Sequence, residues 1–256
     1  MVFIFTALYA EAEEIIKNYA LKKLRNMTKF TLYGNEDICL CVTGSGVMRA
    51  SVGVSAVLAK FSSPEDKVIN IGCAGGNKEG VYLCNKIKDN IFKRTYYPDM
   101  PPKHSFKESE LITEKNVWKG DKEDPCLHDM EASAVYEAAS FFVSPEKIMF
   151  LKIVSDSNGE NVTKEDIRLL FKNNFPLVQD AISLFLKKEE ENFNFTDTSK
   201  IEEALKCTVT MKERLKRIAR YLDIKGSSIY DYLPKELECK SKKEGMKILE
   251  SLEEKI

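Results

Sequence analysis

Residues 70–76 read NIGCAGG, and this stretch begins inside the apolar run Val68–Ile71. The run predicts a buried strand, and the glycines at 72, 75 and 76 predict its end. Glycine weakens a strand, because it has no side chain to pack and loses the most backbone entropy. Its repeated use here indicates that other atoms come very close to this backbone. A tight turn from strand to helix, which glycine makes readily, is the alternative explanation.

The composition is that of a globular protein with balanced charge. The 256 residues are 43% hydrophobic and 31% charged, with a formal net charge of −1. Such a chain can form one large core with an appendage, and it has no overall attraction to nucleic acid or to an anionic membrane. No apolar run approaches the ~20 residues of a membrane-spanning helix. The start, MVFIFTALYAEAEE, turns acidic at once, which is not typical of a signal peptide and favours a buried first strand.

The cysteines and histidines predict neither a metal site nor a disulfide framework. Seven cysteines are scattered without a CxxC pair, and His104 and His128 stand in no ligand spacing. Reduced thiols in a cytoplasmic protein fit this pattern best. The glycines do not match GxGxxG, and TGSG at 43–46 lacks the lysine of a phosphate-binding loop, so we expect no cofactor.

Strands and helices are expected to alternate over the first 188 residues. Alternation of this kind predicts an α/β fold, with a central mixed β-sheet flanked by helices. The least regular part is 94–128, which is rich in proline and then in charge. From hydrophobic periodicity we expect strands at 2–7, 30–33, 38–42, 68–71, 81–87 and 148–154, and helices at 11–24, 50–61, 130–142 and 163–188, the last of them capped by Thr163.

The chain changes character after residue 188. A charged run, KKEEEN at 187–192, predicts a linker, and helices are expected over 199–222 and 241–256. We therefore expect two domains, 1–188 with the sheet and 189–256 as a small helical extension. The basic stretch at 206–220 is typical of a solvated helix face, and a contact surface for nucleic acid is the less favoured alternative.

Three polar or glycine-rich stretches fall at expected strand ends: TGSG (43–46), GCAGG (72–76) and SDSNGEN (155–161). In open α/β sheets, ligands bind beyond the carboxyl ends of the strands. Glu11 and Asp156 follow expected strands, and Glu131 lies at the opening of the helix expected from residue 130. If these strand ends are neighbours, the three carboxylates meet in one crevice and can serve as base, acid and hydroxyl acceptor. The alternative for each is an ordinary acidic residue at a helix N-terminus.

Five segments in order, ALYAEAE, TGSG, NIGCAGG, DMEASAVYEAA and KIVSD, resemble the purine nucleoside phosphorylase/nucleosidase superfamily. The resemblance covers about residues 1–187 and is nearest to the methylthioadenosine/S-adenosylhomocysteine nucleosidase branch. It implies cleavage of the N-glycosidic bond of a purine nucleoside. It also implies a homo-oligomer, with a dimer favoured.

The same resemblance implies roles for individual residues. Glu11 would activate the attacking water, and Glu131 would accept hydrogen bonds from the ribose hydroxyls beside Met130. Asp156 would protonate N7 of the purine with the help of Ser155. The backbone of Cys73, Ala74 and Gly75 would lie against the substrate.

The chain also departs from the family pattern. Cys73 stands where the family has serine, and Lys152 where it has arginine; both positions normally help to place the water or phosphate. The segment from Thr113 to Leu127, which would hold the base, is shorter than usual. Trp118 is a candidate to stack on the base in its place, and a surface or interface tryptophan is the alternative.

The nucleophile is left open by the sequence. Phosphorolysis needs a site for a dianion, usually built from arginines. Before residue 187 the arginines are Arg25, Arg49, Arg94 and Arg168, and none lies in a glycine-rich strand-end loop. Hydrolysis is therefore favoured, with a phosphorylase as the alternative. A non-catalytic protein that binds a nucleoside or nucleic acid is the third possibility.

Overall fold

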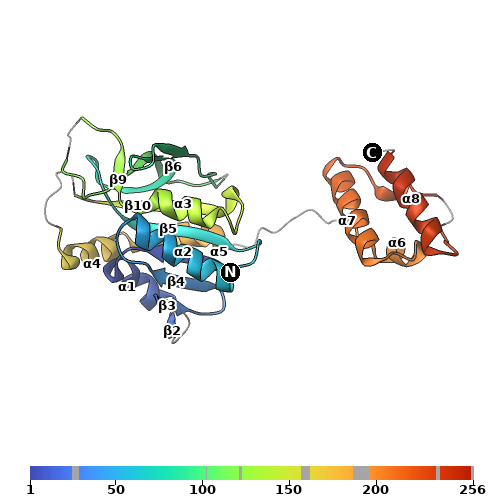
Figure 1. The fold of residues 1–256 in the computed structure, drawn as a ribbon, viewed down its shortest axis with the longest axis horizontal. Coiled ribbons are helices and arrows are strands. Elements are labelled where there is room, and N and C mark those ends of the chain that lie inside the picture. Colours follow the sequence, from blue (N-terminus) through green and yellow to red (C-terminus); the bar gives the residue numbers. More distant parts are fainter. Residues whose placement is uncertain are drawn as a thin grey trace. The chain divides into compact units, whose positions relative to one another are not determined.

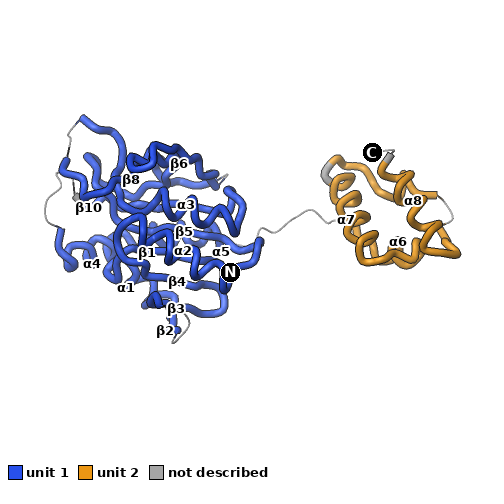
Figure 2. The backbone as a smooth tube through the Cα atoms, viewed as in Figure 1, with its two compact units in different colours: residues 1–188 blue, residues 189–256 orange. Residues whose placement is uncertain are grey.

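A computed structural model describes residues 1–24, 29–101, 103–120, 123–156, 162–186, 196–234 and 237–254, without the side chains of Asp156, Ile224 and Glu254. The chain forms two compact units, Met1–Lys188 and Glu189–Ile256, drawn in blue and orange in Figure 2. The expected linker at 187–192 lies outside the described residues. Among the described helices, none is both long and apolar enough to cross a membrane.

A mixed ten-stranded sheet forms the centre of the larger unit (Figure 1). Its path runs β10-β6-β8-β9-β5-β1-β4-β3-β2, and β7 pairs with β6. β1 pairs in parallel with β4 and β5, whereas β3 is antiparallel to β4. This confirms the expected fold class. The strands are β1 (Val2–Thr6), β2 (Lys22–Leu24), β3 (Thr31–Gly34), β4 (Ile38–Val42), β5 (Lys67–Gly75), β6 (Val81–Asp89), β7 (Arg94–Tyr96), β8 (Lys107–Thr113), β9 (Leu127–Asp129) and β10 (Ile148–Asp156).

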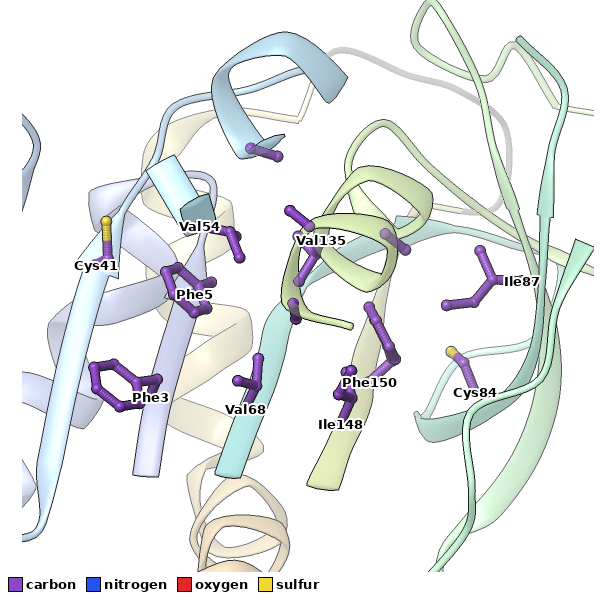
Figure 3. Close-up of a cluster of buried hydrophobic side chains, with 14 of the residues drawn as sticks. Phe3, Phe5, Cys41, Val54, Val68, Cys84, Ile87, Val135, Ile148 and Phe150 are labelled. Atoms are coloured by element: carbon purple, nitrogen blue, oxygen red, sulfur yellow. The ribbon is translucent and has the colours of Figure 1, made fainter. Parts of the chain in front are cut away.

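Helices cover both faces of the sheet because its central strands are apolar on both sides. Along β1, Phe3 and Phe5 face the same buried cluster as Val54 and Val135 (Figure 3). Val2 and Ile4 face a second buried cluster on the other side. The first cluster is covered by α2 (Val47–Phe61) and α3 (Ala132–Ala139), and the second by α1 (Tyr9–Asn18), α4 (Lys164–Asn173) and α5 (Phe175–Leu186); a short 3-10 turn, η1 (Pro145–Lys147), precedes β10.

One strand closes part of the sheet into a ring. β10 pairs in parallel with β5 and antiparallel with β6, while β9 joins β5 to β8 and β8 joins β6. Five strands, β5, β10, β6, β8 and β9, therefore form a closed circuit. The pattern of expected strands did not predict this closure, because β8 and β9 lie in the segment that was expected to be irregular.

The strand at NIGCAGG is longer than expected. β5 does not end before the glycines but runs through Gly72 to Gly75. β10 pairs with it as far as the register partners Asp156 and Gly75, and β1 pairs along its first half. At the glycines it is therefore β10 that holds the backbone in the sheet, joined by β9 at Gly75. The alternative of a tight turn at this point is wrong.

The helix expected over 163–188 is two helices. α4 ends at Asn173 and α5 begins at Phe175, with Asn174 between them. Pro176 explains the break, because proline lacks the N–H of a continuous helix and restricts the residue before it. The start is confirmed: the Thr163 hydroxyl accepts a hydrogen bond from the N–H of Asp166.

Three further boundaries differ from the expectation. The helix expected over 11–24 ends at Asn18, and Lys22–Leu24 forms β2 instead. The segment 94–128, expected to be irregular, contains β7, β8 and the start of β9. The helix expected from residue 130 begins at Ala132, which leaves Met130 and Glu131 at its entrance.

The smaller unit has a hydrophobic core of its own, built from residues such as Ile201, Leu215 and Leu249. Part of the basic stretch is neutralised within this unit. Lys212 Nζ lies 3.1 Å from Glu202 Oε2, and Arg214 Nε donates to Glu253 Oε1 at 2.9 Å. Its elements are α6 (Ser199–Ala204), α7 (Val209–Ile224), the 3-10 turn η2 (Ile229–Asp231) and α8 (Lys242–Glu254).

Candidate active site

A cavity of about 320 Å³ lies at the carboxyl ends of β1, β5, β9 and β10. The structure brings most of the expected site residues to its wall: Glu11, Cys73, Ala74, Gly75, Trp118, Met130, Glu131 and Ser155. Lys152 is not on the wall. The backbone of Asp156 lies at the end of β10 beside Gly75, and its side chain is outside the described part, as are residues 157–161.

Glu11 is fixed by three backbone N–H groups. β1 ends at Thr6 and α1 begins at Tyr9, so the N–H groups of Ala7 and Leu8 point out of the helix start without helical partners. Both donate to Glu11 Oε2 at 2.9 Å, and the N–H of Cys73 donates to Oε1 at 2.9 Å. Burial raises the pKa of Glu11, although these donors and Lys152 act in the opposite direction. The carboxylate is thus held in one orientation at the cavity wall.

Glu131 lies at the entrance of α3, where the strand β9 has just ended. Its Oε1 accepts a hydrogen bond of 2.7 Å from the N–H of Gly46, the residue that precedes α2. Burial, and then the charge of Asp129, raise the pKa of Glu131 to about 7, against the opposing effects of Lys152 and the Gly46 N–H. This group therefore changes its charge near neutral pH.

A buried ion pair lies beneath the two glutamates. Lys152 Nζ lies 2.8 Å from Asp129 Oδ2, and the two side chains are 1% and 0% exposed. Asp129 also accepts from the Thr113 hydroxyl at 2.9 Å and from the N–H of Ala132 at 2.9 Å. Burial alone would lower the pKa of Lys152, but Asp129 and then Glu131 raise it above its ordinary value. Lys152 therefore stays charged and is a support of the site.

Asp129 was missed in the sequence. It directly precedes Met130 and Glu131, so its place in the motif HDMEASA was the available signal. The pairing with Lys152 gave no signal, because the two residues lie on different strands, β9 and β10. This ion pair brings one ammonium group, that of Lys152, close to the three carboxylates of Asp129, Glu131 and Glu11.

Gly72 and Gly75 in β5, and Gly76 directly after it, lie where other side chains approach the backbone closely. A Cβ at Gly72 would lie 3.2 Å from Glu11 Oε1 and 3.4 Å from Lys152 Nζ. A Cβ at Gly75 would lie 2.6 Å from Cε3 of Trp118, and one at Gly76 would lie 2.7 Å from Cδ2 of Leu127. Protein side chains, both charged and aromatic, therefore approach this backbone as closely as its lack of Cβ atoms allows.

An aromatic pair forms the other end of the cavity. The rings of Trp118 and His128 stack with their centroids 4.8 Å apart and an interplanar angle of 9°. His128 Nε2 lies 3.1 Å from Asp124 Oδ2, which holds the imidazole from its edge. Trp118 is thus at the cavity and not at a remote surface. His128 was not expected to contribute, and only its position next to Asp129 could have indicated it.

The remaining wall is formed by Met130 and by the ends of β5 and β10. The Ser155 hydroxyl lies within 3.4 Å of the carbonyl oxygen of Ala74, which links the two strands. Among the described residues, no group of histidine, cysteine, aspartate and glutamate side chains is arranged to hold a metal ion. The acidic groups are instead held by backbone N–H groups and by Lys152.

No protein-family model and no curated protein matches the sequence. Solved structures do match. The 5′-methylthioadenosine nucleosidase of Arabidopsis thaliana has a TM-score of 0.61 and 19% identity, and the match covers 73% of this chain and 96% of that one. An MTAN variant from Chlamydia trachomatis, bound to MTA, has a TM-score of 0.56 and 20% identity over 72% of this chain and 98% of that one.

A third match is the 5′-methylthioadenosine/S-adenosylhomocysteine nucleosidase of Neisseria meningitidis in complex with methylthio-immucillin-A. Its TM-score is 0.57 and its identity 15%, over 73% of this chain and 98% of that one. At such identities the likeness to these structures shows the fold alone. The chain has the fold of the methylthioadenosine/S-adenosylhomocysteine nucleosidases.

Proposed function

We propose that this protein hydrolyses the N-glycosidic bond of a purine nucleoside of the methylthioadenosine or S-adenosylhomocysteine type. The observation that carries the proposal is the meeting of Glu11 and Glu131 in one cavity, at the strand end that bears Asp156. The similar solved structures include nucleosidases named for these substrates, which supports the choice of substrate class.

The geometry suits the charges that this reaction develops. Cleavage of an N-glycosidic bond builds positive charge on the sugar and negative charge on the leaving base. Glu11 and Glu131 place negative charge at one end of the cavity, where they can stabilise the sugar and accept hydrogen bonds from water and hydroxyl groups. Asp156 is our candidate for the acid that protonates the base, because its backbone lies level with Gly75.

Water is the nucleophile that this charge distribution favours. A phosphate dianion would meet Glu11 and Glu131, and the cavity wall that the structure describes contains no arginine or lysine. Lys152, a cation behind this wall, is paired with Asp129 at 2.8 Å. Arg49 is also not part of this wall. Its side chain packs against Gly44, so that a Cβ placed at Gly44 would lie 2.8 Å from Cδ of Arg49. A neutral water molecule avoids the repulsion that phosphate would experience.

Turnover tests the proposal directly. The protein is incubated with adenosine, inosine, methylthioadenosine and S-adenosylhomocysteine, each with and without phosphate, and released base is measured. We expect release without phosphate. Asp156→Asn should lower the rate by about 10²–10⁴-fold, the usual contribution of a general acid. Asp197→Asn makes the same chemical change at an exposed residue of the smaller unit and should leave the rate unchanged.

The other outcomes select the alternatives. An absolute requirement for phosphate would make the protein a phosphorylase. Release of no base from any nucleoside would favour a protein that binds without turnover. An Asp156→Asn rate equal to that of the unmodified protein would remove Asp156 from the mechanism.

A further inference from the structure

The two ends of the cavity differ in chemistry. Gly72, beside the carboxylate of Glu11, and Gly75, beside the indole of Trp118, are three residues apart on β5, or about 10 Å at ~3.3 Å per residue. The Glu11 end offers hydrogen-bond acceptors for hydroxyl groups. The Trp118 end is lined by two stacked aromatic rings and by the apolar side chains of Val117 and Val162. A sugar suits the first end, and a base suits the second.

The base end is already filled by an aromatic ring. The Trp118 indole lies parallel to the His128 imidazole, with an interplanar angle of 9°, and its edge touches the backbone at Gly75. An indole is a flat, fused bicyclic ring of the same kind as a purine. The ring therefore takes up the position and the stacking partner that a bound base would use.

We propose that Trp118 occupies the base subsite of the empty protein, and that a purine base displaces it and stacks on His128 in its place. This inference rests on the proposed function, since it assumes that the cavity receives a purine nucleoside. It assigns Trp118 the opposite role to a permanent stacking partner: the indole competes with the base.

The surroundings of Trp118 allow it to leave. Residues 114–120 form neither helix nor strand, and the adjacent Val117 is 66% exposed. Within the described part of the chain, neither buried cluster of the larger unit includes Trp118. His128, by contrast, is only 5% exposed and is held by Asp124, so it stays in place as the platform.

Displacement has a measurable cost. When the binding-competent state is a minor one, the apparent dissociation constant is raised by the inverse of its population. Minor states populated at about 1–10% would weaken base binding by about 10–100-fold. Removal of the indole should abolish this weakening, so that Trp118→Ala binds a purine more tightly than the unmodified protein.

Adenine is the probe. Its dissociation constant is measured by calorimetry for the unmodified protein, Trp118→Ala, Trp118→Phe and Phe92→Ala, together with KM for methylthioadenosine. We expect tighter adenine binding by about tenfold or more and a lower KM in Trp118→Ala, with a smaller gain in Trp118→Phe. Phe92→Ala removes an aromatic side chain that is 62% exposed and outside the cavity, and it should change neither value.

A second readout needs no variant. Trp118 is the only tryptophan of the chain, so its fluorescence reports on this ring alone. Adenine should shift the emission to longer wavelength as the indole moves into water.

The results separate the inference from the function on which it rests. Weaker or unchanged adenine binding in Trp118→Ala, or an emission that adenine does not shift, overturns the inference even if nucleosides are cleaved. If no protein in the set binds adenine or cleaves a nucleoside, the proposed function fails, and this inference with it.

Discussion

The two ends of the cavity are held in place by different kinds of interaction. At the acidic end, Glu11 accepts three backbone hydrogen bonds, and Lys152 and Asp129 form a buried ion pair. At the aromatic end, Trp118 lies on a segment outside the sheet and is held by ring stacking on His128. The first arrangement is anchored in four strands and two helices, whereas the second depends on one loop.

This difference separates the parts of the site that resist change from those that permit it. Buried charges must keep their partners, because an unpaired charge in the interior is costly. A stacked ring on a loop can move at a cost of a few contacts. We therefore expect substitutions at the acidic end to affect the stability of the whole unit. Substitutions at the aromatic end should affect ligand binding and the position of one side chain.

The largest effect is expected from Lys152→Met, which would test how strongly the acidic end is anchored. The change leaves Asp129 buried without its cation, beside Glu11 and Glu131, and should lower the free energy of unfolding by about 3–5 kcal/mol. Urea denaturation at neutral pH measures the loss. The loss should be smaller in mild acid, where a carboxyl group can take up a proton in compensation.

Lys147→Met is the matched control for this change. Lys147 also pairs with a carboxylate, Glu65, at 3.0 Å, but Glu65 is 88% exposed. Such surface pairs contribute about 0–1 kcal/mol. Equal losses in Lys147→Met and Lys152→Met would contradict the view that the buried pair anchors the site.

The pH dependence of stability gives the next effect. The pKa of Glu131 is raised to about 7 in the folded protein from an ordinary value of 4.5. The folded state therefore binds this proton more tightly than the unfolded state does. The resulting stabilisation is present below pH 4.5 and is lost as the pH rises to about 7. Its size is on the order of 3 kcal/mol, at 1.36 kcal/mol per pKa unit.

Glu131→Gln isolates this contribution. Unfolding free energies measured between about pH 5 and about pH 8 should fall more steeply in the unmodified protein than in the variant. Some slope should remain in Glu131→Gln, because burial also raises the pKa of Glu11. Parallel curves for the two proteins would show that Glu131 ionises normally.

The smallest effects are expected from alanine substitutions at Gly72 and Gly75, one glycine at each end of the cavity. A methyl group at Gly72 would lie 3.2 Å from Glu11 Oε1, which three N–H groups hold in place, so Gly72→Ala should destabilise the unit by about 1–3 kcal/mol. A methyl group at Gly75 would collide with the Trp118 ring. Because that ring can move, Gly75→Ala should cost less but change the tryptophan emission.

Denaturation curves and emission spectra of both variants test this expectation. Gly72→Ala should leave the emission unchanged. An unaltered emission in Gly75→Ala, or a larger loss of stability there than in Gly72→Ala, would mean that Trp118 is held as firmly as Glu11.

The fold class could be predicted from the sequence because its signals are local. Apolar runs and helical periodicity located most strands and helices, and Thr163 marked a helix start correctly. Two errors came from tertiary structure. Glycines normally weaken a strand, but β5 continues through them because β10 pairs along its length. β8 and β9 pair with strands distant in the sequence, and nothing within 94–128 indicates their partners.

The site was predictable where its residues follow directly on strands. Glu11 follows β1, an expected strand, so its placement at the sheet edge could be inferred. Glu131 was placed by its position at the opening of an expected helix and by the motif, because the strand β9 before it was not expected. The Asp129–Lys152 pair could not, because it joins two strands through side chains that meet only in the folded core. The stacking of Trp118 was equally hidden, since it depends on how the segment 114–120 lies over β5.

The ring closed by β10 has a consequence for how the protein is made. β10 pairs with β5 and β6, two strands that leave the ribosome well before it. The hydrogen bond from the N–H of Gly46 to Glu131 likewise joins residues 85 positions apart. Contacts over such separations form late, because the intervening chain must first give up its conformational freedom. During synthesis, β5 and β6 therefore wait with open edges until residue 156 has emerged. We expect a chain stalled before that point to expose strand edges of β5 and β6 that another chain can pair with, and the arrival of β10 to cover them.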